Sequence, residues 1–322
     1  MVILRIILLI ASFSMVVQPT LFGAQIKLIQ LKEVLSIGSS DDDLIFFVTS
    51  VATDEKGFIY LTDSLDYSVK KFNDKGVLIK KAGRKGQGPG EFMFPVLIEC
   101  SQGLIYVADQ TMPGIQVFDS DLKFKTRLHF NFLLFDLKAS SNNSIYGLSL
   151  FLAGEPPIAH IDADVTKNIS LSTMSPGASI IKRSGKFDID GEGNIYFAAS
   201  FEDKIEKYDK YLKKIWQKNL FGGKKARETS DASISTLKGI PTEMIYKEIA
   251  LDRTGHLFIL GGTGAEHRSR DVYVLDADGN YLTTIVLPEP THLLHVDQKN
   301  YLYSRAGEGT TLKKYAVDYV YK

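Results

Sequence analysis

The stretch DGEGNIY (190–196) shows the pattern that decides the fold: an acidic residue, a short polar run, a glycine, then an apolar and an aromatic residue. Glycine tolerates the positive φ of a tight turn, and an aspartate at its start accepts backbone N–H bonds within the turn. Apolar and polar residues alternate on both sides, which is typical of strands. The pattern therefore predicts two antiparallel strands joined by a short turn.

The same pattern occurs six times along the 322 residues. In each unit a third apolar segment follows the hairpin, and five units have a fourth. Repeats of about 40 to 60 residues with four strands each are typical of β-propeller blades. We expect an all-β domain over 25–322, a six-bladed β-propeller of four-stranded antiparallel blades. The other five copies are DEKGFIY (54–60), CSQGLIY (100–106), SSNNSIY (140–146), DRTGHLF (252–258) and DQKNYLY (297–303).

The two ends of the chain predict how the ring closes. The sixth unit leaves no sequence for a fourth strand, whereas IKLIQLKEVLSIG (26–38) precedes the first unit and lacks a partner. Closure of the ring removes unpaired sheet edges, which otherwise attract other chains. We expect this N-terminal strand to complete the sixth blade.

Composition excludes several classes of function. The chain has 38 basic and 38 acidic residues, so it lacks the excess of Lys and Arg that nucleic-acid binding requires. The single cysteine, Cys100, excludes an intrachain disulfide and occupies the turn position that holds aspartate elsewhere. His292 and His295 are three apart on an expected strand and should point to opposite faces. We expect no metal and no cofactor.

Residues 1–24 predict a signal peptide. They contain one charge, Arg5, followed by the apolar run IILLIASFSMVV and an end of small residues. The apolar run is shorter than the roughly 20 residues that span a bilayer as a helix. We expect cleavage after Ala24 and a secreted or periplasmic protein without stable membrane insertion; retention of the segment would make it a membrane anchor.

One blade resembles a known repeat. The stretch GRKGQGPGEFMFPVLIECSQGLIYVADQTMPGIQVFD (83–119) has a glycine-rich approach, then G-x-I-Y-V-A-D, then I-Q-V-F-D. It is similar to the NHL repeat of six-bladed propellers, here of an exported bacterial type. The resemblance implies a binding domain in most cases, although some related six-bladed propellers are lyases or lactonases.

The first strand of each unit lines the central channel of a propeller. Its side chains divide into two sets when positions are counted back from the first residue of the repeated pattern, which is Asp190 in DGEGNIY. Three steps back, every residue is apolar: Val51, Leu97, Leu137, Phe187, Ile249 and Leu294. Two and four steps back, charged residues gather, and strand alternation points them away from the apolar set. These residues are Asp136, Lys138, Lys186, Asp188, Glu248 and His295.

Two roles are open for this charged set. As a structural lining, its members would pair Asp136 with Lys186, Lys186 with Glu248, and Lys138 with Asp188. As a binding site, they would meet a polar ligand together with the loops that join second to third strands and successive blades, which we call the rim. The rim residues we single out are Arg84, His267, Arg268 and Arg305.

We expect a recognition or scaffold module that binds a protein, peptide or glycan through the rim and the channel mouth, rather than an enzyme. No catalytic residue is assigned in that case. The alternative is a lyase or hydrolase, lactonase-like, with its active site at the same mouth. Asp136, Glu248 and His295 would then supply acid and base groups, and Lys186 would stabilise charge.

Overall fold

The computed structural model describes residues 26–38, 44–140, 144–149, 158–161, 184–223, 225–226, 243–262 and 269–321. The expected signal peptide (1–24) and the rim residues His267 and Arg268 lie outside these ranges. Within them the structure is almost entirely β-strand, with one short 3-10 helix at Gly307–Gly309. No helix in the described ranges is long and apolar enough to cross a membrane.

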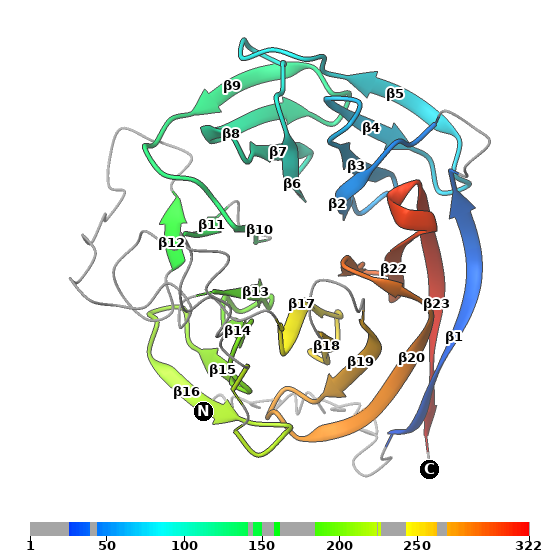
Figure 1. The fold of residues 1–322 in the computed structure, drawn as a ribbon, viewed down its shortest axis with the longest axis vertical. Helices are drawn as coiled ribbons and strands as arrows, with labels where there is room; N and C mark the ends of the chain where they lie inside the picture. The colour runs from blue at the N-terminus through cyan, green and yellow to red at the C-terminus, as the bar shows by residue number, and fades with distance from the viewer. Residues whose placement is uncertain are drawn as a thin grey trace, which may run out of the picture.

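The strands form six antiparallel sheets set around one axis, so the expected six-bladed propeller is confirmed (Figure 1). From the channel outwards, blade 1 consists of β2 (Val48–Thr53), β3 (Ile59–Asp63), β4 (Ser68–Phe72) and β5 (Leu78–Ala82). Blade 2 consists of β6 (Pro95–Ser101), β7 (Leu104–Asp109), β8 (Met112–Asp119) and β9 (Phe124–Leu128). Blade 3 consists of β10 (Asp136–Ala139), β11 (Ile145–Leu148) and β12 (Ile158–Ile161). Blade 4 consists of β13 (Gly185–Ile189), β14 (Ile195–Ala199), β15 (Ile205–Tyr208) and β16 (Lys214–Lys218). The fourth strand expected in blade 3 (168–174) lies outside the described residues.

The last two blades show how the ring closes. Blade 5 consists of β17 (Tyr246–Leu251), β18 (Leu257–Gly261), β19 (Ser269–Leu275) and β20 (Tyr281–Thr291). Blade 6 consists of β21 (Leu294–Val296), β22 (Tyr301–Ala306) and β23 (Thr311–Tyr321), with β1 (Ile26–Ile37) as its outer strand. Strands β1 and β23 pair antiparallel, with Lys32 opposite Ala316. Closure by the N-terminal strand is therefore confirmed.

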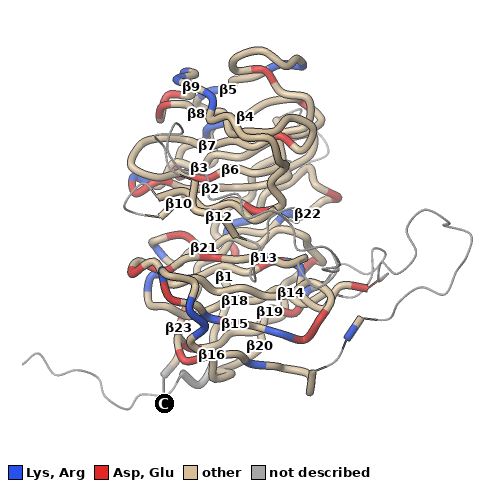
Figure 2. Tube along the Cα trace, turned by 90° about the vertical axis from the view of Figure 1, so that its left-hand side faces the viewer, with Lys and Arg blue, Asp and Glu red and all other residues tan. Residues whose placement is uncertain are grey.

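The hydrophobic core is divided among the blade interfaces. Six clusters of buried apolar side chains lie in the described part of the chain, and each joins two neighbouring blades. Val51 of blade 1, for example, packs in one cluster with Tyr303 of blade 6. A propeller blade cannot bury its two apolar faces alone, so each sheet depends on both neighbours. In the edge-on view, basic and acidic segments are interspersed along the blades, in line with the balanced composition (Figure 2).

Blade 2 departs from the expected alignment by one residue. Tyr196 of blade 4 pairs with Asp188, but the corresponding Tyr106 of blade 2 pairs with Glu99. The blade 2 hairpin turns through Gln102 and Gly103, both with positive φ, and the connection from Glu99 to Tyr106 is one residue shorter than the connection from Asp188 to Tyr196. When the blades are aligned on the turn glycine, the first strand of blade 2 is therefore displaced by one residue relative to that of blade 4.

The shift corrects two expectations. Ile98, which is 1% exposed, takes the place that we assigned to Leu97 in the apolar set, and Glu99 turns towards the channel. Cys100 lies in strand β6 and not in a turn. Burial raises the pKa of its thiol to about 12, which makes it unreactive. All six apolar residues of the expected set, Leu97 included, are buried as predicted.

The turn aspartates accept backbone N–H bonds, as expected, and they also accept a tyrosine hydroxyl. Asp297 accepts N–H bonds from Lys299 and Tyr301 at 2.8 and 2.9 Å, and the Tyr303 hydroxyl donates to it at 2.9 Å. In blades 1, 4 and 6 the tyrosine belongs to the repeated pattern itself and ties the turn to its own hairpin, whereas in blade 5 the hydroxyl comes from Tyr319 of blade 6. In blade 2 the aspartate is absent, and the buried Tyr106 hydroxyl has no hydrogen-bond partner among the described residues.

We expect these two tyrosines to respond differently to loss of the hydroxyl. Tyr303→Phe should lower the free energy of unfolding by about 1 to 2 kcal/mol, because it removes a buried hydrogen bond to a carboxylate. Tyr106→Phe should leave it unchanged or raise it slightly, because a hydroxyl without a partner is removed from the interior. Urea unfolding of both variants measures the difference, and equal losses would contradict this account.

Candidate functional site

A cavity of about 130 Å³ lies in the channel at the centre of the ring, and residues of all six blades form its wall. We call it the channel cavity. Of the expected site residues, it brings together Asp136, Lys138, Lys186, Glu248 and His295. Its other polar or charged lining residues are Thr49, Ser50, Glu99, Lys247 and His292.

Ion pairs in the wall match the expected lining in part. The Lys186 ammonium lies 3.8 Å from an Asp136 oxygen and 3.4 Å from a Glu248 oxygen, so both predicted pairs of Lys186 are confirmed. The predicted pair of Lys138 with Asp188 was wrong, because the Lys138 ammonium lies 3.3 Å from Glu99. The shortened hairpin of blade 2 brings Glu99 into this position.

Two of the aspartates bridge neighbouring blades through the backbone. Asp136 accepts N–H bonds from Leu137 at 2.9 Å and from Phe187 of the next blade at 3.0 Å. Asp188 accepts them from Ile189 at 2.8 Å and from Leu251 of the next blade at 2.7 Å. The first strand of each blade is an edge strand with unpaired N–H groups, and buried N–H groups need an acceptor. These carboxylates supply it.

Burial changes the ionisation of the lining. It raises the pKa of Glu99 to about 8, although the Lys138 ammonium acts in the opposite direction. It also raises the pKa of Glu248 and of Asp188. Burial alone would lower the pKa of Lys138 and Lys186, but the surrounding carboxylates outweigh it and raise both. The lysines therefore stay charged at neutral pH, while Glu99 is largely protonated.

The two histidines of blade 6 both line the channel cavity. Burial, followed by the charge of Lys138, lowers the pKa of His295 to about 3, so its ring is neutral. Its Nε2 lies 3.0 Å from the Thr53 hydroxyl. The expectation that His292 points away from His295 was wrong: strand β21 begins only at Leu294, so strand alternation does not extend to His292. In the described ranges, no group of three or more His, Cys, Asp or Glu side chains is placed to hold a metal ion.

The described rim residues lie outside the channel cavity. Arg84, whose side chain is 82% exposed, pairs with Glu91 at 2.8 Å in the glycine-rich loop. Arg305 donates to the Val48 carbonyl at 2.8 Å, and its guanidinium lies 4.6 Å from the centre of the Phe47 ring. Arg305 thus ties blade 6 to blade 1.

Three titratable lining residues were missed from the sequence: Glu99, Lys247 and His292. A count from the repeated tyrosine, instead of from the glycine, would have found Glu99, because that tyrosine always pairs with the same channel position. Lys247 enters the wall beside Glu248 because the pairing of β17 with β18 shifts between Tyr246 and Glu248. A bulge of this kind has no marker in the sequence.

Comparison with known proteins supports the fold. A family model described as a 6-bladed beta-propeller, DUF5128, matches residues 27–246. No curated protein sequence matches the chain. Similar solved structures include a Bacteroides fragilis protein named as exported, with a TM-score of 0.63 and 11% identity over 91% of this chain and 95% of that one. Another is a duf4221 family member from Bacteroides vulgatus, with a TM-score of 0.61 and 14% identity over 91% of this chain and 99% of that one. A third is virginiamycin B lyase from Staphylococcus aureus, with a TM-score of 0.56 and 10% identity over 89% of this chain and 99% of that one. At these identities the likeness extends to the fold alone.

Proposed function

Because the chain belongs to the DUF5128 family of 6-bladed beta-propellers, we propose a function that uses the ring itself. In this proposal the protein is a recognition module for a protein, peptide or glycan, which places one polar group in the channel cavity and rests on the rim. The resemblance of 83–119 to an NHL repeat agrees with a binding role and stays a prediction.

The observation that carries the proposal is the size and character of the channel cavity. Its volume of about 130 Å³ is below the roughly 300 to 1,000 Å³ of pockets that enclose a whole small ligand. Its wall nevertheless holds charged side chains from blades 2, 3, 4 and 5. A cavity of this kind accommodates one polar group of a larger ligand, whose remainder would lie on the rim.

Export of the protein is part of the proposal. It is supported by the basic and apolar pattern of residues 1–24, and a structural neighbour in Bacteroides fragilis is named as an exported protein. N-terminal sequencing of the protein from the extracellular or periplasmic fraction tests it. A start near Gln25 supports export, and an intact Met1 in the membrane fraction contradicts cleavage.

One observation favours the enzymatic alternative. The carboxyl group of Glu248, with a pKa raised by burial, lines the channel cavity beside the Lys186 ammonium. A raised pKa favours the protonated form of a carboxyl group, which is the form that acts as a general acid in a lyase or hydrolase. Turnover of any substrate that depends on Glu248, and is lost in Glu248→Gln without loss of binding, would favour this second function.

A blocked channel mouth tests the recognition function. Ser50 lines the channel cavity, so Ser50→Trp should fill it and abolish binding to the peptides or glycans that the wild-type protein retains on an array. Lys75→Trp is the control, because Lys75 is exposed in the β4–β5 turn, away from the cavity wall. Circular dichroism and thermal unfolding confirm that both variants fold. Unchanged binding by a folded Ser50→Trp protein would rule out the channel mouth.

A further inference from the structure

Two of the three lysines that line the channel cavity, Lys138 and Lys186, make no short hydrogen bond to any described residue. The nearest acceptors to the Lys186 ammonium are the Phe135 carbonyl and Glu248, both at 3.4 Å, and Lys138 lies 3.3 Å from Glu99. A well-formed N–H···O bond measures about 2.7 to 3.2 Å. Each ammonium has three donors, so both groups retain unused hydrogen-bonding capacity at the cavity wall.

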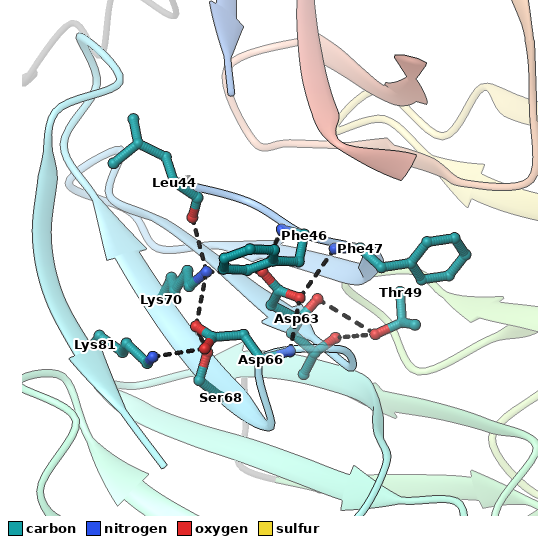
Figure 3. A network of polar contacts seen from close by, with 10 residues as sticks. Leu44, Phe46, Phe47, Thr49, Asp63, Asp66, Ser68, Lys70 and Lys81 are labelled. Atoms are coloured by element: carbon teal, nitrogen blue, oxygen red, sulfur yellow. Dashed lines mark hydrogen bonds and ion pairs between the residues drawn. The ribbon is translucent and has the colours of Figure 1, made fainter. Parts of the chain in front are cut away.

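A third buried lysine shows what a saturated ammonium looks like in this protein. Lys70 contacts Asp63 and the Leu44 carbonyl at 2.7 Å each and Asp66 at 2.9 Å, so all three donors have short partners (Figure 3). Its side chain is 2% exposed and lines no part of the channel cavity. Lys70 is a structural lysine, and the contrast assigns a different role to the channel pair.

The acidic groups near the cavity are partly engaged by the backbone or have a raised pKa. Asp136 takes two backbone N–H bonds, as does Asp188, which is not part of the cavity wall, and these contacts stabilise the edges of the inner strands. Burial shifts Glu99 and Glu248 towards their neutral forms. The balance of charge at the cavity therefore favours the cations at neutral pH. The lowered pKa of His295, to which Lys138 contributes, agrees with a positive potential there.

We propose that the channel cavity binds a carboxylate group, with the Lys186 ammonium as its main partner and Lys138 as the second cation. This inference rests on the proposed recognition function and specifies the group that enters the cavity. A carboxylate accepts several charge-assisted hydrogen bonds and fits within about 130 Å³. The group belongs either to a small organic acid or to the end of a larger ligand.

The test compares three small probes of similar size at constant ionic strength: acetate, acetamide and methylammonium. Acetate alone should raise the thermal unfolding temperature of the wild-type protein. Lys186→Gln should weaken acetate binding by about 10- to 100-fold, because it removes a charge-assisted hydrogen bond. Lys213→Gln, which makes the same change at an exposed turn residue, should bind as the wild-type protein does.

A second variant guards against poor folding of Lys186→Gln. Glu248→Gln removes the acid that competes for Lys186 and should tighten acetate binding. A short peptide with a free C-terminus, compared with its amidated form, distinguishes a terminal carboxylate from a free organic acid. Equal responses of wild-type and Lys186→Gln proteins to acetate would overturn the inference.

The outcomes separate this inference from the function on which it rests. If acetamide or methylammonium binds instead, and Ser50→Trp abolishes that binding, the channel cavity is a recognition site and the carboxylate is excluded. If no probe binds and the Ser50→Trp protein matches the wild-type protein on the array, both the inference and the proposed function fail.

Discussion

Asp63→Ala is expected to lower the free energy of unfolding by about 3 to 5 kcal/mol, the usual cost of breaking a fully buried ion pair. Asp63 is completely buried and accepts four hydrogen bonds, including one from Lys70 at 2.7 Å (Figure 3). Two of the others come from the backbone N–H groups of Phe46 and Phe47. Alanine leaves these donors without an acceptor inside the protein.

The same cluster provides a matched control. Lys81 pairs with Asp66 at 2.7 Å, but its side chain is 46% exposed, so water and salt screen the pair. Lys81→Met should therefore cost less than about 1 kcal/mol. Urea unfolding of the two variants beside the wild-type protein measures both effects. Losses of similar size would show that the Asp63 network is not a structural anchor of the ring.

Glu99→Gln is expected to stabilise the protein at alkaline pH. Burial raises the pKa of Glu99 from 4.5 to about 8 in the folded state. Below pH 4.5 the group is protonated in both the folded and unfolded states and has no effect. Between pH 4.5 and 8 the unfolded chain loses the proton first, so the stability of the wild-type protein falls as the pH rises.

Each unit of pKa shift corresponds to about 1.4 kcal/mol, so the variant should exceed the wild-type protein by about 3 to 5 kcal/mol above pH 8. The difference should vanish near pH 4.5. Urea unfolding at pH 4.5, 6.5 and 8.5 measures it, with Glu55→Gln as a control at an exposed turn residue. A difference that is constant with pH, or that favours the wild-type protein at pH 8.5, would contradict the raised pKa of Glu99.

Together the two experiments separate the buried charges of the ring into two kinds. The Asp63 and Lys70 cluster is expected to stabilise the protein, because each group has short partners. The channel cavity keeps charges that are only loosely paired, at 3.3 to 3.8 Å. Loosely paired buried charges cost stability unless a ligand compensates them, which is the physical basis for placing the binding site there.

The sequence by itself determined the number of blades, the closure of the ring by 26–38 and the charged side of the inner strands. These features depend on turn chemistry and on the two-residue period of strands, which are local properties of the chain. The positions of Asp136, Lys186, Glu248 and His295 in one cavity wall follow from that period once the blades form a ring.

Only the tertiary structure decided which charges meet. Glu99 reaches Lys138 because one hairpin is a residue shorter, and Lys247 enters the cavity through a local shift in strand pairing. Asp188 turns instead to the backbone of Leu251 on the next blade. Such contacts depend on the distances between neighbouring blades and on where each strand begins. A periodic pattern carries no information about either, because packing between sheets fixes both.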